Sequence, residues 1–344
     1  MLTRRRGQWR VQLGLVALAL IGATGCPVVN NLPAPGRVLD QQEPEFGRKY
    51  YLYVPSNYHD GRKWPLVVTC HGTKYWDTAH RQLEEWKGLA EQKGFLVAAP
   101  ELVGTAGDLA PPAEEQIRRQ MDDEHAILSV VRAISVARSI DSARIFLTGW
   151  SAGGYAVLFT GLRHPEVFRA LAVRQGNFDA SFVEPCLPFL DRYQPIQVMY
   201  GHMDPLQEHA DRAIQWLRNH DFEPVVLERP GIHRRDPKPV FDFFVDVVRH
   251  RPWIRVVVRD HMHDPMRVVF GVRASFEPTE YLWDFGDKQR SPIAQPEHRY
   301  DKPGLYTVRV GLRAPKDGRF VRQLQLQVPR LRLGIATPTT LPAP

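Results

Sequence analysis

The chain has 344 residues, of which 43% are hydrophobic and 24% are charged, so it is long enough for a sizeable core and for about two domains. Its formal net charge is +7, but residues 1–25 hold four arginines and no acidic residue. The remainder has 41 basic against 38 acidic residues, a balance too small to favour a nucleic-acid partner.

The N-terminus has the pattern of a targeting segment. A basic head, "MLTRRRGQWR", precedes the apolar stretch "VQLGLVALALIG" and the small-residue run "ATGC". The apolar stretch is shorter than the roughly 20 residues that span a bilayer, so residues 1–25 are predicted to be a removable signal peptide. The cysteine after the small residues resembles a bacterial lipobox, which implies that Cys26 is lipidated and anchors an exported protein to a membrane at the periplasm or cell surface. The alternative is ordinary cleavage and secretion, with Cys26 incidental.

Residues 26–44 are rich in Pro, Asn and Gln and are predicted to be a flexible tether. From residue 45 to 250, short apolar runs such as "PLVVTCHG", "RIFLTGW" and "IQVMYG" alternate with amphipathic segments of helical period. Strands that alternate with helices predict right-handed crossovers and a mostly parallel sheet with helices on both faces. The fold class expected for this region is therefore α/β.

The pattern changes near residue 252. Beyond it, alternating runs such as "RVVFGVRAS" and "LYTVRVGLRA" are separated by turn residues at the spacing of a sandwich. Residues 253–329 are therefore predicted to form a small all-β domain. The tail, residues 330–344, has no apolar face to bury and is predicted to be disordered.

Cys70 and Cys186 are the cysteines that remain after Cys26. An exported protein permits a disulfide between them, but their spacing leaves two buried free thiols equally open. The sequence has no Cys/His cluster with metal-ligand spacing, so neither a metal nor another cofactor is expected.

The stretch "LTGWSAGGYAV" places Ser151 between a predicted strand and a predicted helix. A G-x-S-x-G sequence in this setting predicts a nucleophile elbow, in which a tight turn lifts the serine hydroxyl to the end of the sheet. The alternative is a Gly-rich helix entry that binds phosphate, but no lysine or G-x-G-x-x-G pattern accompanies it.

A nucleophilic serine needs a base, and the base needs an orienting acid. Asp204 follows the strand of "PIQVMYGHMDPL", and His233 follows the strand of "PVVLERPGIHRRDP", so both are predicted at carboxyl ends of strands, in hydrolase order. Asp204 has a second possible role as a helix cap. The rival candidates are Asp211, Asp236, His202 and His71.

The stretch "PLVVTCHGTKYW" runs a strand into His-Gly and predicts one side of an oxyanion hole. Its backbone donor is assigned to Thr73, with Gly72 as the near alternative, and the second donor is the N–H of Ala152. Three aromatic residues are candidates for the substrate pocket and equally for the core: Tyr75, Trp76 and Trp150.

Together these stretches resemble an α/β-hydrolase of the polyhydroxybutyrate-depolymerase and feruloyl-esterase-like group. The resemblance covers residues 45–250 and rests on "YYLYVPSNYHDGRKWPLVVTCHG", "LAEQKGFLVAAPE", "IDSARIFLTGWSAGGYA" and "PIQVMYGHMDP". It implies Ser151 as nucleophile, Asp204 as orienting acid and His233 as base. The chain departs from the group at Thr73, where glycine or cysteine is common, and at "GIHRRD", where an aromatic residue commonly follows the histidine.

Residues 253–329 resemble a PKD-type β-sandwich through "YLWDFGDKQRSPIAQPEHRYDKPGLYTVRVGL". Lys288 stands where the family usually has glycine. Trp283 and Phe285 alternate with Asp284, which predicts that Trp283 is a core anchor and no ligand platform.

These observations predict a secreted or surface-anchored serine esterase that cleaves carboxylic esters, including polysaccharide-linked acetyl or feruloyl esters and polyester oligomers, through an acyl-enzyme. One alternative is a serine peptidase similar to prolyl oligopeptidase. The other is a surface-binding protein with an inactive hydrolase domain. Nothing in the sequence predicts the oligomeric state.

Overall fold

The computed structural model describes residues 36–315 and 318–329. The predicted signal peptide, its Cys26 and the predicted tail at 330–344 lie outside the described residues. Within the described part of the chain, no helix combines the length and the apolar character that crossing a membrane requires.

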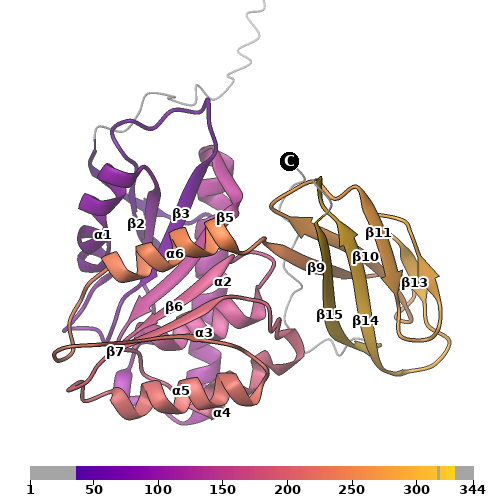
Figure 1. Cartoon of the computed structure of the whole chain (residues 1–344). Helices are drawn as coiled ribbons and strands as arrows, with labels where there is room; N and C mark the ends of the chain where they lie inside the picture. Colours follow the sequence, from indigo (N-terminus) through magenta and orange to yellow (C-terminus); the bar gives the residue numbers. More distant parts are fainter. Residues whose placement is uncertain (1–35, 316–317, 330–344) are drawn as a thin grey trace, which may run out of the picture. The chain divides into compact units, whose positions relative to one another are not determined.

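The first domain is built on an eight-stranded sheet with the order β1-β2-β4-β3-β5-β6-β7-β8 (Figure 1). Strand β2 pairs antiparallel with β1 and with β4, and all other neighbours are parallel, which confirms the mostly parallel sheet. The strands are β1 (Val38–Gln42), β2 (Lys49–Tyr53), β3 (Trp64–Cys70), β4 (Leu96–Pro100), β5 (Ile140–Trp150), β6 (Ala170–Arg174), β7 (Ile196–Gly201) and β8 (Val225–Arg229).

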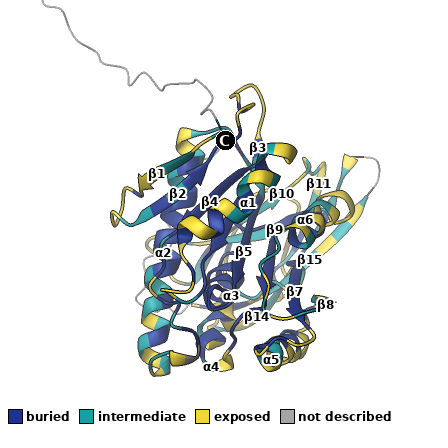
Figure 2. Ribbon diagram, turned by 90° about the vertical axis from the view of Figure 1, so that its left-hand side faces the viewer, coloured by how far each residue is buried: buried dark blue, intermediate teal, exposed yellow. Residues whose placement is uncertain are grey.

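Helices cover both faces of this sheet, and each face has its own hydrophobic core. Helices α1 and α6 pack on one face, and α2, α3 and α5 pack on the other. Every residue of β4, β6 and β7 is buried, as expected for strands covered on both sides (Figure 2). The helices are α1 (Ala79–Lys93), α2 (Ala113–Ala137), α3 (Gly153–Arg163), the short α4 (Ala180–Val183), α5 (Gln207–Asn219) and α6 (Lys238–His250).

The structure corrects the predicted tether at residues 26–44. Its described part contains β1, which pairs with β2 over five residues although its side chains are partly or fully exposed. An edge strand of this kind is held by backbone hydrogen bonds, so the polar sequence "VLDQQ" gives no apolar alternation to detect. The buried carboxylate of Glu43 then accepts the N–H groups of Glu45, Phe46 and Arg48, which fixes the turn into β2.

The second domain has two antiparallel sheets, in the orders β13-β10-β9 and β12-β11-β14-β15. Both sheets contribute to one core around Phe270, Trp283 and Phe285, which confirms the small all-β sandwich and Trp283 as a buried anchor. The strands are β9 (Ile254–Asp260), β10 (Arg267–Ala274), β11 (Glu280–Asp284), β12 (Arg290–Ser291), β13 (Glu297–Arg299), β14 (Gly304–Arg313) and β15 (Arg319–Val328).

Candidate active site

Ser151 lies in the turn between β5 and α3 with a backbone φ of 54°. A non-glycine residue in this left-handed region costs about 1 kcal/mol, so the surrounding structure must hold it. The N–H of Ser151 donates to the carbonyl of Arg174 at 3.1 Å, and its own carbonyl accepts the N–H of Gly154 at 2.9 Å and of Asn177 at 3.1 Å. The turn therefore has the strain and the strand–helix setting of a nucleophile elbow.

The glycines around Ser151 are required by the close approach of backbone atoms. A Cβ at Gly149 would lie 2.6 Å from the carbonyl oxygen of Gly153. A Cβ at Gly153 would lie 2.5 Å from the carbonyl oxygen of Cys70, at the end of the adjacent strand β3. These contacts explain the G-x-S-x-G pattern by sterics alone.

Asp204 and His233 form a hydrogen-bonded pair at the carboxyl ends of β7 and β8. His233 Nδ1 lies 3.1 Å from each carboxylate oxygen of Asp204, whose side chain is fully buried. An ionised carboxylate only accepts, so Nδ1 carries the proton and the neutral ring has a free lone pair on Nε2. Asp204 Oδ1 also accepts the N–H of Leu206 at 2.8 Å, which stabilises the turn before α5. The N-cap of α5 is Leu206, so Asp204 does not have the predicted capping position.

The loops that carry this pair pack directly against each other. The N–H of Met203 donates to the carbonyl of Gly231 at 3.2 Å. A Cβ at Gly201 would lie 2.4 Å from the same carbonyl oxygen, so position 201 admits no side chain. Close packing of the two loops thus sets the distance between Asp204 and His233.

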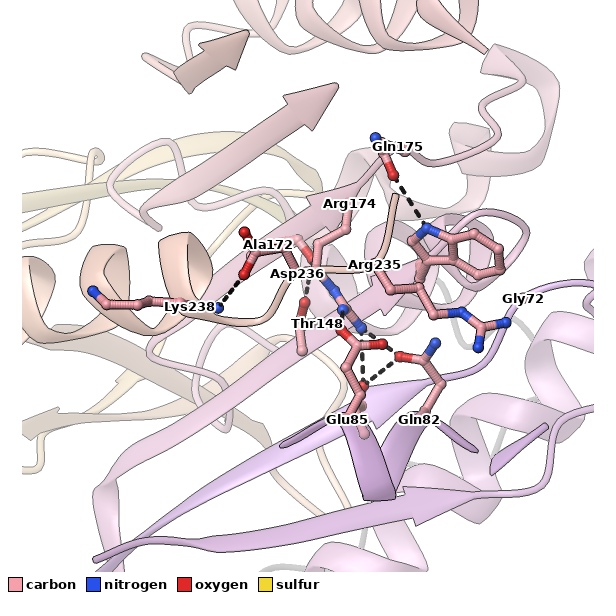
Figure 3. A network of polar contacts seen from close by, with 12 residues as sticks. Gly72, Gln82, Glu85, Thr148, Ala172, Arg174, Gln175, Arg235, Asp236 and Lys238 are labelled. Carbon is pink, nitrogen blue, oxygen red and sulfur yellow. Dashed lines mark hydrogen bonds and ion pairs between the residues drawn. The ribbon is translucent and has the colours of Figure 1, made fainter. Parts of the chain in front are cut away.

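Trp150 connects Ser151 to His233. It directly precedes the serine, and its ring lies 4.5 Å from the His233 ring, centroid to centroid. Its Nε1–H donates to Gln175 Oε1 at 3.2 Å, as Figure 3 shows, and Gln175 Nε2 donates to the carbonyl of Ile232 at 3.0 Å. No hydrogen bond joins Ser151 Oγ to His233 within residues 36–315, and such contacts in hydrolases often tighten only when substrate binds.

The rival acids and histidines do not share this arrangement. Asp236 pairs with Arg229 and accepts the N–H of Lys238, the first residue of α6. Asp211 is an exposed residue of α5. His202 is exposed and contacts the backbone of Arg229 and Gly231.

His71 has a structural position beneath the loop after β3. Its Nε2 accepts the N–H of Leu102 at 2.9 Å, so Nδ1 carries the proton and donates to the carbonyl of Gly72 at 2.7 Å. Burial lowers the pKa of His71, which favours this neutral form. The His-Gly sequence therefore fixes the backbone that leads to Thr73.

The backbone donors predicted for the oxyanion hole differ in availability. The N–H of Gly72 already donates to Asp77 Oδ2 at 2.8 Å, which excludes it as a free donor. In the described chain, the N–H groups of Thr73 and Ala152 have no hydrogen-bond partner. A Cβ at Gly72 would lie 3.1 Å from the Cβ of Ser151, so the loop of Thr73 passes directly beside the serine.

The three predicted pocket aromatics occupy different environments. Tyr75 is 98% exposed and Trp76 is 76% exposed, in the loop that follows Thr73. Trp150 is buried and packs against His233, so it supports the site from within. Tyr75 has a φ of 77°, and the turn around it is closed by the N–H of Trp76 donating to the carbonyl of Thr73.

A buried polar network around Arg174, whose carbonyl accepts the N–H of Ser151, was not predicted from the sequence. The guanidinium of Arg174, at the end of β6, pairs with Glu85 and contacts Gln82 of α1, as Figure 3 shows. Burial raises the pKa of Glu85, which Arg174 opposes by its positive charge. These residues come from separate segments without a shared motif. The sequence predicted the helix "HRQLEEWKGLAEQK" and the strand "ALAVRQG" that carry them, but gave no signal that their side chains meet.

Cys70 and Cys186 are free thiols, which settles the question of a disulfide between them. Both are fully buried, and burial raises the pKa of each thiol. Neither therefore has the character of a reactive thiolate.

Two protein families match parts of the chain. Residues 85–196 match the prolyl oligopeptidase family, and this range includes Ser151 but ends before Asp204 and His233. Residues 249–318 match the PKD domain.

Acetylxylan esterase A from Talaromyces purpureogenus is 28% identical over 132 residues, which are 38% of this chain and 34% of that protein. Acetylxylan esterase A from Aspergillus oryzae is 27% identical over 124 residues, 36% of this chain and 39% of that protein. The matches thus span about a third of the length of these curated relatives.

Among solved structures, a ferulic acid esterase from Anaeromyces mucronatus is 17% identical and covers 61% of this chain and 88% of its own, with a TM-score of 0.48. The fold is identified from the sheet itself and from the family matches. Three observations point to the same fold. They are the strand order with its antiparallel β2, the strained serine turn between β5 and α3, and the two matched ranges. The chain combines an α/β-hydrolase domain with a C-terminal PKD domain.

Proposed function

We propose that the protein is a serine hydrolase of carboxylic esters, with Ser151 as nucleophile, His233 as general base and Asp204 as the acid that orients it. One observation carries the proposal. The strained Ser151 adjoins Trp150, and the ring of Trp150 packs on a histidine whose Nδ1 is bound to a buried carboxylate. A serine, a base and an orienting acid are the parts that acyl transfer needs.

In the first half of the proposed reaction, Ser151 Oγ attacks the acyl carbon while His233 Nε2 takes the hydroxyl proton. The N–H groups of Thr73 and Ala152 stabilise the negative charge on the acyl oxygen, where preorganised donors lower the barrier most. Collapse of the tetrahedral intermediate breaks the ester C–O bond, and His233 returns the proton to the leaving alcohol. Asp204 stabilises the imidazolium that forms between these steps.

In the second half, water replaces the alcohol. His233 Nε2 takes a proton from the water, whose oxygen attacks the acyl carbon of the acyl-enzyme. The same two N–H groups bind the second oxyanion, and collapse releases the acid and restores the Ser151 hydroxyl. Apart from the water and the ester, every group used belongs to the chain itself.

The substrate class proposed is an acyl ester carried on a polysaccharide, such as an acetyl or feruloyl ester, with polyester oligomers as a second class. Two of the relatives are named acetylxylan esterases, which supports the first class. Tyr75 and Trp76 add exposed ring surface beside the Thr73 loop, and exposed rings of this kind suit contact with a sugar or an aromatic acyl group.

The test is replacement of the nucleophile. We expect Ser151→Ala to abolish labelling by a fluorophosphonate probe and to lower ester hydrolysis by at least about 10⁴-fold, because the attacking oxygen is lost. Measurements on acetylated xylan, feruloyl esters and polyhydroxybutyrate oligomers would rank the substrates. Ser291→Ala in the PKD domain is the matched control and should keep both signals. Labelling that persists in Ser151→Ala would refute the assignment.

A serine peptidase is the second candidate, because residues 85–196 match the prolyl oligopeptidase family. It shares the serine chemistry, so a probe alone does not separate the two. Cleavage of a proline-containing peptide anilide faster than of the ester panel would favour the peptidase. A wild-type chain that the probe does not label would favour a non-catalytic binding protein.

We also propose that the chain is exported and that Cys26 carries a lipid anchor, because "ATGC" follows a basic head and an apolar stretch. Expression in a bacterial host with lipoprotein processing should place the protein in the membrane fraction. Cys26→Ser should release it to the soluble fraction with its esterase activity intact. Equal fractionation of both forms would contradict the anchor.

A further inference from the structure

Asp77 is a fully buried carboxylate that the proposed mechanism does not use. Its Oδ2 accepts the N–H of Gly72 at 2.8 Å and the side-chain amide of Gln82 at 2.7 Å. Its Oδ1 has no hydrogen-bond partner in the described chain and lies 3.0 Å from Nη2 of Arg235, so at this oxygen the ion pair is the contact that compensates the buried charge. A buried charge is costly unless it is paired and hydrogen-bonded, so this carboxylate holds its neighbours strongly in place.

The first neighbour is the oxyanion loop, defined as residues 72–77. Asp77 closes this loop twice, through its side chain to the N–H of Gly72 and through its own N–H to the carbonyl of Thr73 at 3.0 Å. Both closures lie next to the N–H of Thr73. The direction of that N–H therefore depends on where Asp77 is held.

The second neighbour is the histidine loop, defined as residues 230–236. Arg235 lies two residues after His233, and its Nη2 donates to the carbonyl of Trp76 at 3.1 Å as well as pairing with Asp77. Its guanidinium also lies 4.4 Å from the centre of the Trp150 ring, which packs on His233. A guanidinium can satisfy a carboxylate, a carbonyl and a ring at once because it is planar and has several donors.

We propose that Asp77 and Arg235 are positioning residues, whose ion pair makes the oxyanion-loop geometry and the placement of His233 depend on each other. The proposal rests on the proposed function, since it assigns these residues to the same active site. Neither is a catalytic residue, because each acts through a neighbour: Asp77 through Thr73, and Arg235 through the loop of His233.

The ion pair should affect the transition state more than substrate binding. The oxyanion forms only during reaction, and His233 moves a proton only during reaction, so misplacement of either lowers kcat. The exposed Tyr75 and Trp76 rings proposed for substrate contact remain, so KM should change little. Replacing a residue with a purely structural role would lower the yield of folded enzyme, but the kcat and KM of the enzyme that does fold would stay the same.

The first experiment compares Arg235→Gln with wild type. We expect kcat on the best ester to fall about 10- to 100-fold, with KM within about threefold, as for loss of alignment or of one oxyanion donor. Arg235→Lys should recover part of kcat, because an ammonium can pair with Asp77 but cannot also reproduce the planar contacts. The matched control is Arg234→Gln, which removes an exposed arginine next in sequence to both His233 and Arg235.

The second experiment is a double-mutant cycle with Asp77→Asn, which keeps the residue's size but removes its charge. If the ion pair is the functional unit, the double variant should lose about as much kcat as the more impaired single variant. Circular dichroism and thermal unfolding would show whether Asp77→Asn is folded. Should it not fold, the comparison of Gln and Lys at position 235 still decides the proposal.

The proposal would be overturned by unchanged kcat in Arg235→Gln, by an effect on KM alone, or by losses that simply multiply in the double variant. An equal loss in Arg234→Gln would also overturn it, because general charge would then be the cause. Failure of the proposed function is distinguishable, since in that case wild type itself would neither hydrolyse esters nor be labelled at Ser151.

Discussion

At the scale of single residues, the carbonyl oxygens at the end of β3 exclude any side chain at position 153. A Cβ there would approach Cys70 O to 2.5 Å and His71 O to 2.8 Å, and neither is a flexible side chain that can move aside. The same backbone leads to the oxyanion loop. Relief of the clash would therefore shift the serine turn and that loop apart.

We expect Gly153→Ala to destabilise the hydrolase domain by about 1–3 kcal/mol, the usual cost of overpacking, and to slow fluorophosphonate labelling of Ser151. Chemical denaturation and labelling rates would measure the two effects. Gly88→Ala is the control. Gly88 is exposed on α1, and a Cβ at that position would meet nothing within 4 Å apart from its chain neighbours and the backbone of its own helix, so alanine should stabilise by up to about 1 kcal/mol. Normal labelling of Gly153→Ala would show that the turn tolerates a side chain.

Residues with a local pattern were the ones that the sequence could identify. Ser151 has a motif around it, and Asp204 and His233 each follow an apolar run that was recognisable as a strand. Asp77 and Arg235 have no such signal, because an acid in a loop and an arginine beside another arginine are ordinary surface residues in sequence terms. Their partners become visible only when loops far apart in the chain meet.

At the scale of secondary-structure elements, a buried ionic cluster joins α2 to the C-terminal end of α3. Glu124 Oε1 accepts from Arg163 Nε at 2.7 Å and lies 2.5 Å from His164 Nε2, and Glu166 lies 3.1 Å from His164 Nδ1. Burial by itself would lower the pKa of His164, but the hydrogen bonds to Glu124 and Glu166 outweigh it and raise the pKa to about 9. The histidine is thus charged at neutral pH.

A histidine whose pKa rises on folding stabilises the protein fully below its unfolded pKa of about 6.5, and this contribution is lost as pH rises through about 9. We expect His164→Gln to lower the free energy of unfolding by up to about 3 kcal/mol at pH 6, with a much smaller difference near pH 10. Urea unfolding at both pH values would measure it. His250→Gln, at an exposed position on α6, should show little difference at either pH. A pH-independent effect of His164→Gln would rule out the charged form.

The two edges of the large sheet show where prediction from sequence fails and where it succeeds. Strand β8 alternates between intermediate and exposed residues, yet its apolar run "PVVLE" was sufficient to place it. Strand β1 is also an edge strand, but "VLDQQ" is mostly polar and its pairing is carried by backbone groups. Interior strands are recognisable because both of their faces are buried, which requires apolar side chains. An edge strand can be held by the backbone hydrogen bonds to one neighbour, so its sequence need not be apolar.

At the scale of the whole molecule, the sequence predicted two domains because the hydrophobic period changes near residue 252. In the described structure, two large hydrophobic clusters and a small one around Tyr155 lie in the region of the large sheet, and a further cluster lies within the sandwich. Fold class follows from such periodicities, since they reflect which faces are buried. The details of the candidate site cannot be predicted in this way, because they depend on loop conformations, which leave no periodic pattern of hydrophobic residues in the sequence.

The position of β8 has a consequence for the order in which the site is assembled. A chain made from its N-terminus delivers the serine turn with β5 and α3 in the interior of the sheet, long before residue 233 exists. The histidine arrives in the loop that follows β8, the last strand added to this sheet, which lies at an edge with β7 as its single neighbour. With the proposed roles of Ser151 and His233, a nascent hydrolase domain, or one truncated before residue 233, holds a nucleophile without a base. Hydrolytic competence would then be a late event in biosynthesis.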